Sequence, residues 1–484
     1  MLFNSYEFIF LFLPITLFIY MNLWRISKFE KSCQIIFLAF ASLVFYAYWD
    51  VKYLPLLIIS ILFNYYMSLA INRSKSKKQL FFALTVNFLL LGFFKYTGFI
   101  IDTLKLFFDL SFATPNIILP LGISFFTFTQ TAFLVDCYRD RDHKDCNMSN
   151  YSLFVTIFPH LIAGPILYHK NIIPQFLDKT KSIFSFKNFS FGLVIFIAGL
   201  FKKVMIADNL ALNVNLGFSN PAALSFFEAW LAALGYTMQL YFDFSGYSEM
   251  AIGLALMFNF DFPVNFMAPY KATSIIDFWR RWHITLSDFL KNYLYIPLGG
   301  SHAGKFAHIR NLFITMLLGG LWHGAGWTFI IWGALHGVLL IGNHLWRKLN
   351  ISMPRVISWF LTFLCVMLAW VFFRANTVND AFSIIQKMFA WQDIILPTTI
   401  RSLIPFVKEY GLTQVKAFEV FKEVKVFSFY LGISLVLCFL LPDALPFIKD
   451  KFKPNMGWLI IIVLAFVICI LNLHNVTEFL YFQF

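Results

Sequence analysis

The chain has 484 residues, of which 60% are hydrophobic, 20% are aromatic and only 13% are charged. Typical soluble domains carry about 25% charged residues, so this composition excludes an ordinary soluble protein and indicates a polytopic membrane protein. The formal net charge is +13, but the lysines and arginines are scattered at the ends of apolar runs, which favours membrane anchoring over nucleic-acid binding.

Apolar runs of about 20 residues, long enough to cross a bilayer as helices, follow one another along the chain. They lie near residues 5–24, 33–49, 53–71, 79–101, 116–138, 151–168, 188–201, 223–258, 311–346, 356–373, 426–441 and 457–473. The runs at 223–258 and 311–346 are each long enough for two passes. We therefore predict an all-α fold with about 11–13 transmembrane or re-entrant helices, the first of them retained and not cleaved as a signal peptide.

Basic residues follow the first, third and fifth runs, at 25–31, 73–78 and 139–144. Because basic loops stay on the cytoplasmic side, these exits predict an extracytoplasmic N-terminus. A less hydrophobic segment at 375–425 intersperses Lys, Glu and Phe, which predicts amphipathic helices lying on the surface. No linker-like composition and no repeat divides the chain, so residues 1–484 are predicted to form a single membrane domain.

One amphipathic segment has the start and stop signals of a helix. Ser274 and Asp277 have the S-x-x-D spacing of a capping box, and a proline and two glycines at 297–300 signal its end. Asp277 also lies three and four residues before Arg280 and Arg281, a spacing that favours ion pairing. One face of the predicted helix carries Trp279, Trp282, His283 and Leu286.

A second histidine, His323, lies in the apolar run 311–346 and is flanked by Gly319, Gly320, Gly324 and Gly326. Glycine permits irregular backbone and close approach, and irregular backbone at membrane depth is tolerated only where it faces protein or a water-filled cavity. We therefore predict a buried, partly wet cavity with His323 on its wall. The alternative is structural, because glycines at this spacing also let helices pack closely and a histidine beside them can bond a neighbouring helix. For His336, on a more regular stretch, we expect the structural role.

Signatures of soluble enzymes do not occur. The chain has no G-x-S-x-G, no H-E-x-x-H and no phosphate-binding loop, and its six cysteines lack metal-site spacing, so no metal is predicted. What remains is histidine chemistry in a membrane, because a neutral imidazole accepts the proton of an attacking hydroxyl near physiological pH. His283 and His323 are predicted to meet at one cavity.

A series of motifs runs nearly from one end of the chain to the other. They are ILPLGISFFTF (118–128), LVDCYR (134–139), IFPHLIAGPI (157–166), QLYFDFSGYSEMAIGL (239–254), DFWRRWHITLS (277–287), YLYIPLGG (293–300), RNLFITMLLGGLWHGAGWTFIIWGALHG (310–337), WVFFRA (370–375) and the terminal FLYFQF. In this order they resemble the membrane-bound O-acyltransferase (MBOAT) family, most closely its bacterial alginate and peptidoglycan O-acetylation branch. The resemblance implies an MBOAT fold with a central catalytic cavity or tunnel, and a catalytic core at 275–340.

The resemblance also implies roles for individual residues. The histidine of the W-H-G motif, His323, is expected to be catalytic, and the histidine of W-R-R-W-H, His283, to be the second polar residue of the site. Candidate donor-binding residues are Arg280, Arg281, Trp279 and Trp282. The alternative for the two arginines is a positive anchor at the membrane interface. Asp243, Ser245, Tyr247 and Glu249 of YFDFSGYSEM are expected to have buried hydrogen-bonding roles.

The implied activity is that of an O-acetyltransferase in the bacterial inner membrane, in contact with membrane lipid. It would move acetyl from a cytoplasmic thioester toward hydroxyls of an extracytoplasmic polysaccharide. The expected donor is acetyl-CoA, as a substrate and not a permanently bound cofactor, and the expected partner is an extracytoplasmic acetyltransferase of the serine-hydrolase type. Two alternatives from other classes are a transporter or flippase for an acylated carrier or glycan without ester chemistry, and a scaffold for a polysaccharide-modifying complex.

Overall fold

The structure is a computed structural model that describes residues 1–26, 30–108, 113–139, 146–302, 304–390, 418, 420–475 and 480. Within these ranges the chain forms helices and loops and no strand. The helices in chain order are η1 (Glu7–Phe12), α1 (Leu13–Ile26), α2 (Glu30–Ala47), η2 (Val51–Tyr53), α3 (Leu54–Ser74), α4 (Lys77–Leu91), η3 (Gly92–Tyr96), α5 (Thr97–Phe108), α6 (Ile123–Arg139), α7 (Met148–Thr156), α8 (Phe158–Leu161), α9 (His169–Leu177), η4 (Lys179–Ser182), α10 (Phe186–Phe201), η5 (Lys202–Ala207), α11 (Asp208–Ser219), η6 (Pro221–Ala223), α12 (Phe226–Met257), η7 (Pro269–Lys271), α13 (Ile275–Trp279), α14 (Ile284–Leu290), η8 (Lys291–Tyr295), α15 (Lys305–His323), α16 (Trp327–Lys348), α17 (Arg355–Arg374), α18 (Val378–Met388), α20 (Val424–Phe439), α21 (Ala444–Lys451), α22 (Met456–Leu471) and η11 (Leu473–Asn475). The predicted all-α class is therefore confirmed.

Several helices are long and apolar enough to cross a membrane. In the part of the chain that the structure describes there are five, namely Val51–Ser74, Lys77–Phe108, Phe186–Ser219, Trp327–Lys348 and Arg355–Arg374. A sixth results if α20 and α21, bent by 60° at their junction, are taken as one broken span. Further helices, α22 among them, are apolar but shorter.

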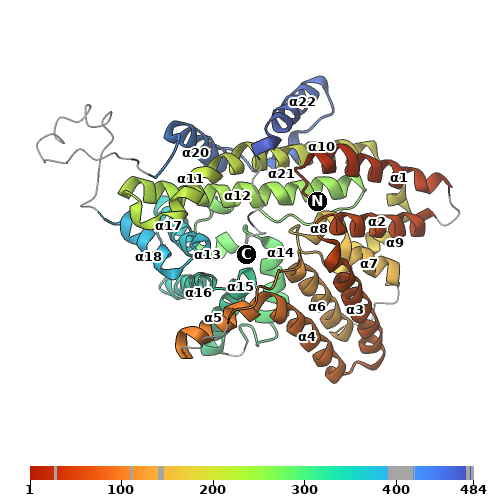
Figure 1. Cartoon of the computed structure of the whole chain (residues 1–484), viewed down its shortest axis with the longest axis horizontal. Helices are drawn as coiled ribbons and strands as arrows, with labels where there is room; N and C mark the ends of the chain where they lie inside the picture. The colour runs from red at the N-terminus through yellow and green to blue at the C-terminus, as the bar shows by residue number, and fades with distance from the viewer. Residues whose placement is uncertain are drawn as a thin grey trace, which may run out of the picture.

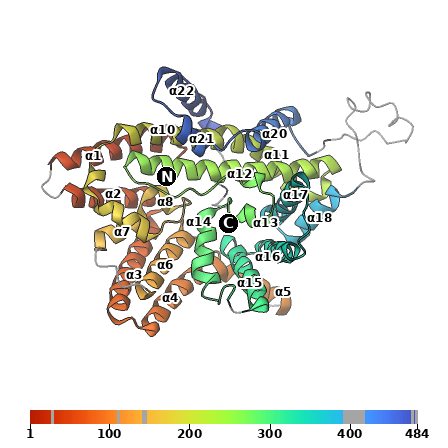
Figure 2. The same cartoon turned by 180° about the vertical axis from the view of Figure 1, so that it is seen from behind.

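The central helix α12 corrects one sequence prediction. The run at 223–258 was predicted to make two passes, but it forms one helix of 32 residues. A complete capping box of Ser225 and Glu228 starts this helix, and no proline interrupts it. Because nearly all of its residues are buried, α12 lies inside the bundle beside α10 and α11 (Figures 1 and 2).

The run at 151–168 was predicted to span and does not. It forms the short helices α7 and α8, separated at Ile157, whose backbone leaves the helical region at ψ 114°. Pro159 follows in the first turn of α8, because its missing N–H is tolerated there. Both helices are buried, so they pack within the bundle and are not surrounded by lipid.

Glycine pairs bring the largest helices into backbone contact. A Cβ added to Gly199 would lie 2.5 Å from the carbonyl oxygen of Gly246, so α10 and α12 touch where YFDFSGYSEM has its glycine. In the same way α15 and α16 form a close antiparallel hairpin, since a Cβ on Gly320 would lie 2.3 Å from the Phe329 carbonyl oxygen. The run at 311–346 forms two helices, α15 and α16, which pack closely at these glycines. Of the two, α16 is among the helices long and apolar enough to cross a membrane.

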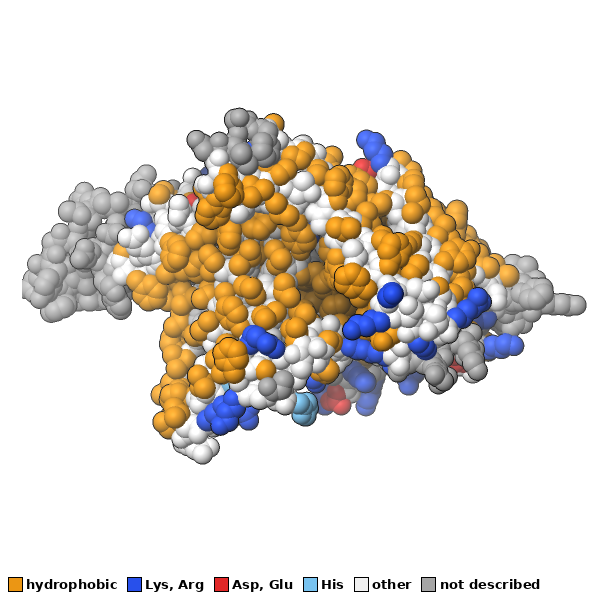
Figure 3. Space-filling model, turned by 90° about the horizontal axis from the view of Figure 1, so that it is seen from below, with side chains coloured by type: hydrophobic (Ala, Val, Ile, Leu, Met, Phe, Trp, Pro, Cys, Tyr) orange, Lys and Arg blue, Asp and Glu red, His pale blue; other side chains and the backbone are white. Residues whose placement is uncertain are grey.

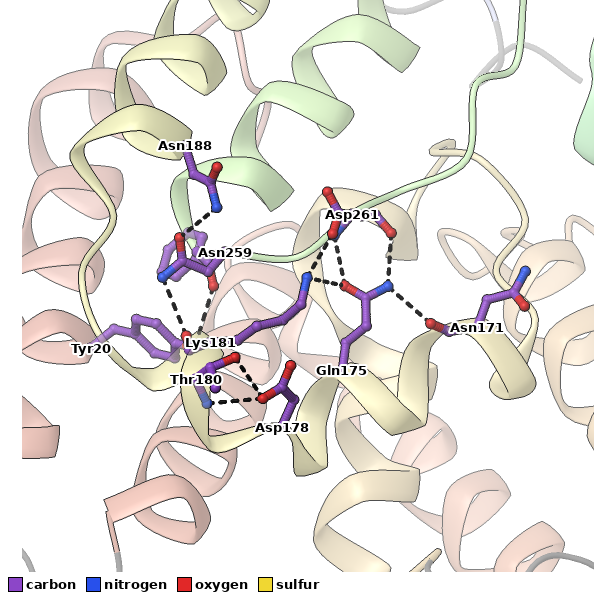
Figure 4. A network of polar contacts seen from close by, with 10 residues as sticks. Tyr20, Asn171, Gln175, Asp178, Thr180, Lys181, Asn188, Asn259 and Asp261 are labelled. Carbon is purple, nitrogen blue, oxygen red and sulfur yellow. Dashed lines mark hydrogen bonds and ion pairs between the residues drawn. The ribbon is translucent and has the colours of Figure 1, made fainter.

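A polar network fixes the segment that leads from α12 toward α13 (Figure 4). Lys181 pairs with Asp261 at 2.6 Å, and Gln175 accepts from the Asp261 backbone N–H at 2.8 Å. Asn259, in a left-handed conformation at φ 65°, donates to the Ile183 carbonyl oxygen at 2.6 Å. These contacts anchor residues 258–261 against the α9–α10 connection, and the segment then continues toward the candidate site.

The predicted amphipathic segment 375–425 is described only in part. Its first portion forms α18, which has a capping box of Thr377 and Asp380 and buries Ala381, Ile384 and Met388 on one face. Residues 391–417 and 419 lie outside the described residues.

Candidate active site

His323 is the last residue of α15. The chain is extended at Gly324 (φ −155°) and Gly326, and α16 begins at Trp327, so the predicted irregular backbone at this histidine is confirmed. The His323 ring is 6% exposed. Its centroid lies 4.9 Å from that of Trp322, 5.1 Å from Trp332 and 5.2 Å from Phe373.

His283 does not lie on the continuous helix predicted from Ser274. Ser274 does cap a helix, accepting from the Asp277 N–H at 3.1 Å, but that helix ends at Trp279. His283 adopts a left-handed conformation at φ 43°, and α14 begins only after it. The predicted common face of Trp279, Trp282, His283 and Leu286 is therefore wrong.

Asn265 explains the break in this helix. Its backbone carbonyl oxygen accepts from the Ile284 N–H at 3.0 Å, and its side-chain oxygen accepts from the Thr285 N–H at 3.3 Å. Because these two donors bond to another segment, the helix is interrupted at His283. The prediction of a continuous helix is therefore wrong, because residue spacing does not encode this tertiary contact.

The same asparagine orients the His283 ring. Its Oδ1 lies 3.1 Å from His283 Nδ1 and also accepts from the Thr285 hydroxyl at 3.0 Å. Because the Thr285 N–H and hydroxyl both donate to this atom, it is the amide oxygen of Asn265 and accepts from the His283 ring as well. We therefore assign the ring proton to Nδ1, which leaves Nε2 as the acceptor nitrogen. His283 is fully buried.

The two histidines lie close together, but His323 lines the small cavity described below and His283 is not among its lining residues. The ring centroids of the two histidines are 6.4 Å apart and their planes are inclined by 60°. At this separation one small reacting group can reach both rings, which suits a site where one imidazole takes a proton and the other orients or polarises a substrate.

Two residues missed by the sequence reasoning hold the end of α15. Lys95 Nζ donates to the carbonyl oxygens of Trp322 at 2.6 Å and His323 at 3.0 Å. The Tyr96 hydroxyl donates to the Leu321 carbonyl oxygen at 2.9 Å. A signal for Lys95 was present, because a lone lysine inside the run 79–101 is an ionisable residue at membrane depth. Asn265 gave no such signal.

Two cavities meet at Trp322. The first has a volume of ≈ 120 Å³, and its wall includes Lys95, Ser124 and His323. The second has a volume of ≈ 320 Å³ and is mainly apolar. It is lined by residues of α4, η3, α6, α14, η8 and α15, among them Leu84, Phe88, Phe128, Phe289, Leu318 and Trp322. The predicted cavity at His323 is thus present, and a larger apolar cavity lies on the other side of its neighbour.

The outer surface beside α4 is suited to both lipid and anions. Figure 3 shows this side of the molecule as mostly hydrophobic and hollowed near its middle, with Lys and Arg side chains gathered along one edge. Arg139, at the end of α6, lies over the ring of Tyr293 at 5.7 Å and donates to the Asn292 carbonyl oxygen at 3.3 Å. Tyr293 lines the apolar cavity, so a guanidinium lies close to one end of that cavity.

The four predicted donor-binding residues differ in their surroundings. Arg280 is exposed, whereas Arg281 pairs with Asp277 at 2.8 Å, as its spacing predicted. Trp279 and Trp282 are buried, 9% and 3% exposed, and pack in an aromatic cluster. The role of all four in donor binding stays a prediction.

Of the residues expected to be structural, His336, Asp243 and Glu249 form buried polar contacts, whereas the buried Ser245 hydroxyl has no hydrogen-bond partner among the described residues. His336 is fully buried, and its Nδ1 accepts from Trp279 Nε1 at 3.3 Å. In YFDFSGYSEM, Asp243 pairs with Lys203 at 2.6 Å and Glu249 pairs with Lys202 at 2.5 Å. These ion pairs join α12 to η5 and agree with a structural role.

Comparison with known proteins gives the family. The model of the membrane-bound O-acyltransferase family matches residues 43–379. The chain is 46% identical over 428 residues to a peptidoglycan O-acetyltransferase of Helicobacter pylori, covering 82% of this chain and 81% of that protein. It is 43% identical over 410 residues to the probable alginate O-acetylase AlgI of Pseudomonas aeruginosa, covering 81% and 76%.

A more distant likeness is to a teichoic acid D-alanyltransferase of Bacillus subtilis, at 28% identity over 246 residues, which are 49% of this chain and 61% of that protein. The match to the family model covers more than half of the chain and includes both histidines and the two cavities at Trp322. The family match therefore favours an acyltransferase over the alternatives of a transporter or a scaffold without ester chemistry. The chain belongs to the membrane-bound O-acyltransferase family and is an O-acyltransferase.

Proposed function

We propose that this enzyme moves acetyl groups from a cytoplasmic thioester, acetyl-CoA, across the bacterial inner membrane for O-acetylation of an extracytoplasmic polysaccharide such as peptidoglycan or an alginate-like polymer. The main support is the pair of cavities that meet at Trp322 beside His323. The similarity to peptidoglycan and alginate O-acetylating proteins supports the acetyl group and the polymer class.

The predicted topology indicates which side of the membrane each cavity faces. Lys77, at the start of the span Lys77–Phe108, follows a basic exit and is predicted to be cytoplasmic. The apolar cavity begins nearer this end of the span, at Leu84 and Phe88, and extends to Tyr96, whereas the smaller cavity is lined by Lys95 and by no earlier residue of the span. We therefore propose that the apolar cavity binds the acyl-bearing part of the thioester donor and that the smaller cavity receives the acceptor hydroxyl.

The lining of the apolar cavity favours acetyl over D-alanyl. Among its described lining residues there is no carboxylate that would pair with the ammonium group of a D-alanyl donor. A charged amine in an apolar cavity without a partner is strongly disfavoured. An acetyl group has no such charge.

In the proposed reaction His323 is the general base. Its ring takes the proton of the acceptor hydroxyl as the acceptor oxygen attacks the thioester carbonyl carbon, and it returns that proton to the departing thiolate. General base catalysis of this kind typically contributes about 10²–10⁴ in rate. His283, fixed by Asn265, orients or polarises the reacting groups. Arg280 and Arg281 remain proposed phosphate ligands, and Arg139 is a further one because it lies beside the apolar cavity.

The immediate acceptor is proposed to be a small hydroxyl group of an extracytoplasmic partner of the serine-hydrolase type. A hydrated polysaccharide strand would have to leave water to reach a cavity of ≈ 120 Å³, and burying its unpaired hydroxyls is unfavourable. A partner that receives acetyl at the membrane and passes it to the polymer avoids this penalty.

The test is reconstitution in liposomes with radiolabelled acetyl-CoA inside and glycan outside, with and without the partner. We expect labelled glycan only with the partner, and no transfer by His323→Ala. The matched control is His302→Ala, a change at an exposed histidine, which should keep transfer at the wild-type rate. Transfer by His323→Ala at the wild-type rate would contradict the general-base role, and efficient glycan acetylation without a partner would contradict the relay.

A further inference from the structure

The last three carbonyl groups of α15 are bound by two consecutive residues from another helix. The final carbonyls of a helix have no N–H partner inside it. Here Tyr96 binds the carbonyl of Leu321, and Lys95 binds those of Trp322 and His323. Both donors lie on η3, a π-helical turn inside the span Lys77–Phe108. Such turns are rare and occur frequently at functional sites.

Capping alone does not require the charge of Lys95. Tyr96, the next residue, binds a carbonyl of the same helix end with a neutral hydroxyl. A charged group inside a membrane is costly and usually marks function. In the part of the chain that the structure describes, no carboxylate lies within 4.0 Å of the Lys95 ammonium, whose bonds are to two carbonyls and the Ser124 hydroxyl.

Lys95 lines the small cavity, and one of its three N–H donors remains after the two helix-end carbonyls are bound. Lysine has three donors, and two of them bind the carbonyls of Trp322 and His323. The third reaches the Ser124 hydroxyl at 3.4 Å, longer than the ordinary range of such bonds. Lys95, Ser124 and His323 line the same cavity. An anionic oxygen formed there would be a stronger acceptor for this N–H than Ser124.

The partial charge of the helix end also favours a positive charge at this position. The C-terminus of a helix carries roughly −0.5 elementary charge, and α15 ends at His323. That partial charge would oppose a negative oxygen forming beside this histidine. A lysine ammonium bound to the same carbonyls makes the local charge positive instead of negative.

On the basis of the proposed acyl transfer, we propose that Lys95 is a catalytic residue whose ammonium stabilises the oxyanion of the tetrahedral intermediate. When the acceptor oxygen bonds to the acyl carbonyl carbon, its proton passes to His323 and the carbonyl electron pair moves onto the oxygen beside Lys95. On collapse the carbonyl re-forms and the carbon–sulfur bond breaks. The thiolate takes the proton from the His323 imidazolium.

The experiment compares four variants in the liposome assay, with kcat, KM for the donor and thermal unfolding measured for each. Lys95→Gln keeps N–H donors and removes the charge, and Lys95→Arg keeps the charge. Tyr96→Phe removes a neutral cap and keeps the ring that lines the apolar cavity. Lys105→Gln is the matched control, because Lys105 lies on the same span but bonds Thr114 instead of α15.

We expect Lys95→Gln to lower kcat by about 10²–10³, the effect of removing one oxyanion donor, with an unchanged KM. Lys95→Arg should retain kcat within about tenfold. Tyr96→Phe should lower thermal stability with kcat within about threefold of wild type, and Lys105→Gln should behave as wild type.

A wild-type kcat for Lys95→Gln would overturn the proposal, as would equal losses for Lys95→Gln and Tyr96→Phe, since both point to capping alone. If Lys95→Gln does not fold, Lys95→Arg decides: activity within about tenfold supports the proposal, and a stable protein with about 10³-fold lower kcat overturns it. Failure of the wild-type enzyme to transfer acetyl would instead contradict the proposed function.

Discussion

Replacing Asn265 with leucine tests how His283 is positioned. The side chain is 1% exposed, and its Oδ1 accepts from His283 Nδ1 and from both the N–H and the hydroxyl of Thr285. Its Nδ2 donates to the Ser248 hydroxyl at 3.3 Å. Leucine has a similar size and removes all four bonds, so the substitution tests the hydrogen bonds and not the volume.

The magnitude follows from the donors left behind. Each lost bond contributes about 0.5–1.5 kcal/mol, and a buried donor left without an acceptor costs about 1–3 kcal/mol. We therefore expect Asn265→Leu to lower the free energy of unfolding by about 3 kcal/mol. Because His283 loses the contact that fixes its tautomer and ring orientation, kcat should fall by roughly 10–100-fold, as for other orienting partners of functional histidines.

The assay is acetyl transfer in liposomes, together with thermal unfolding in detergent. The matched control is Lys181→Met, which breaks the 2.6 Å ion pair that anchors the same segment through Asp261 but does not touch His283. This partly exposed pair should contribute less than about 1 kcal/mol, and kcat should not change. If Asn265→Leu is folded and transfers acetyl at the wild-type rate, the orienting role of Asn265 is refuted.

Three further predictions concern the base, the hairpin and the topology. His323→Ala should reduce acetyl transfer by at least about 10² in the liposome assay, and its elution as a monodisperse protein would separate this loss from misfolding. Gly333→Ala should lower the free energy of unfolding by about 2 kcal/mol, because a Cβ there would lie 2.5 Å from the Met316 carbonyl oxygen. Gly342→Ala should be neutral or stabilising, because no atom lies within 4 Å of an added Cβ. Thermal unfolding of both variants checks this contrast. The topology is tested by cysteine labelling in a background without native cysteines. A membrane-impermeant thiol reagent applied from outside should label Val51→Cys, at a 63% exposed position, but not Lys78→Cys. The reverse pattern would contradict the predicted topology.

The sequence alone determined the features that depend on composition and on neighbouring residues. Hydrophobic content and run length predicted an all-helical membrane protein, since about 20 apolar residues are needed to cross a bilayer as a helix. The glycines around His323 predicted the irregular backbone after the histidine, and close helix packing, the structural alternative for the same glycines, is also present in the hairpin of α15 and α16. The Asp277–Arg281 pair followed from i, i+4 spacing. Each of these depends on a local pattern that is preserved in the folded chain.

Only the tertiary structure decided the features that depend on distant partners. Spacing predicted a continuous helix through His283, but Asn265, 18 residues earlier, accepts from the Ile284 and Thr285 N–H groups that would continue it. Lys95 and His323 are 228 residues apart in the chain, and only packing brings the ammonium to that carbonyl. Polar groups buried in a membrane must find partners within the protein, and those partners are set by the arrangement of the whole bundle. The positions of His283 and Lys95 in the site are therefore properties of the tertiary structure and not of residue spacing.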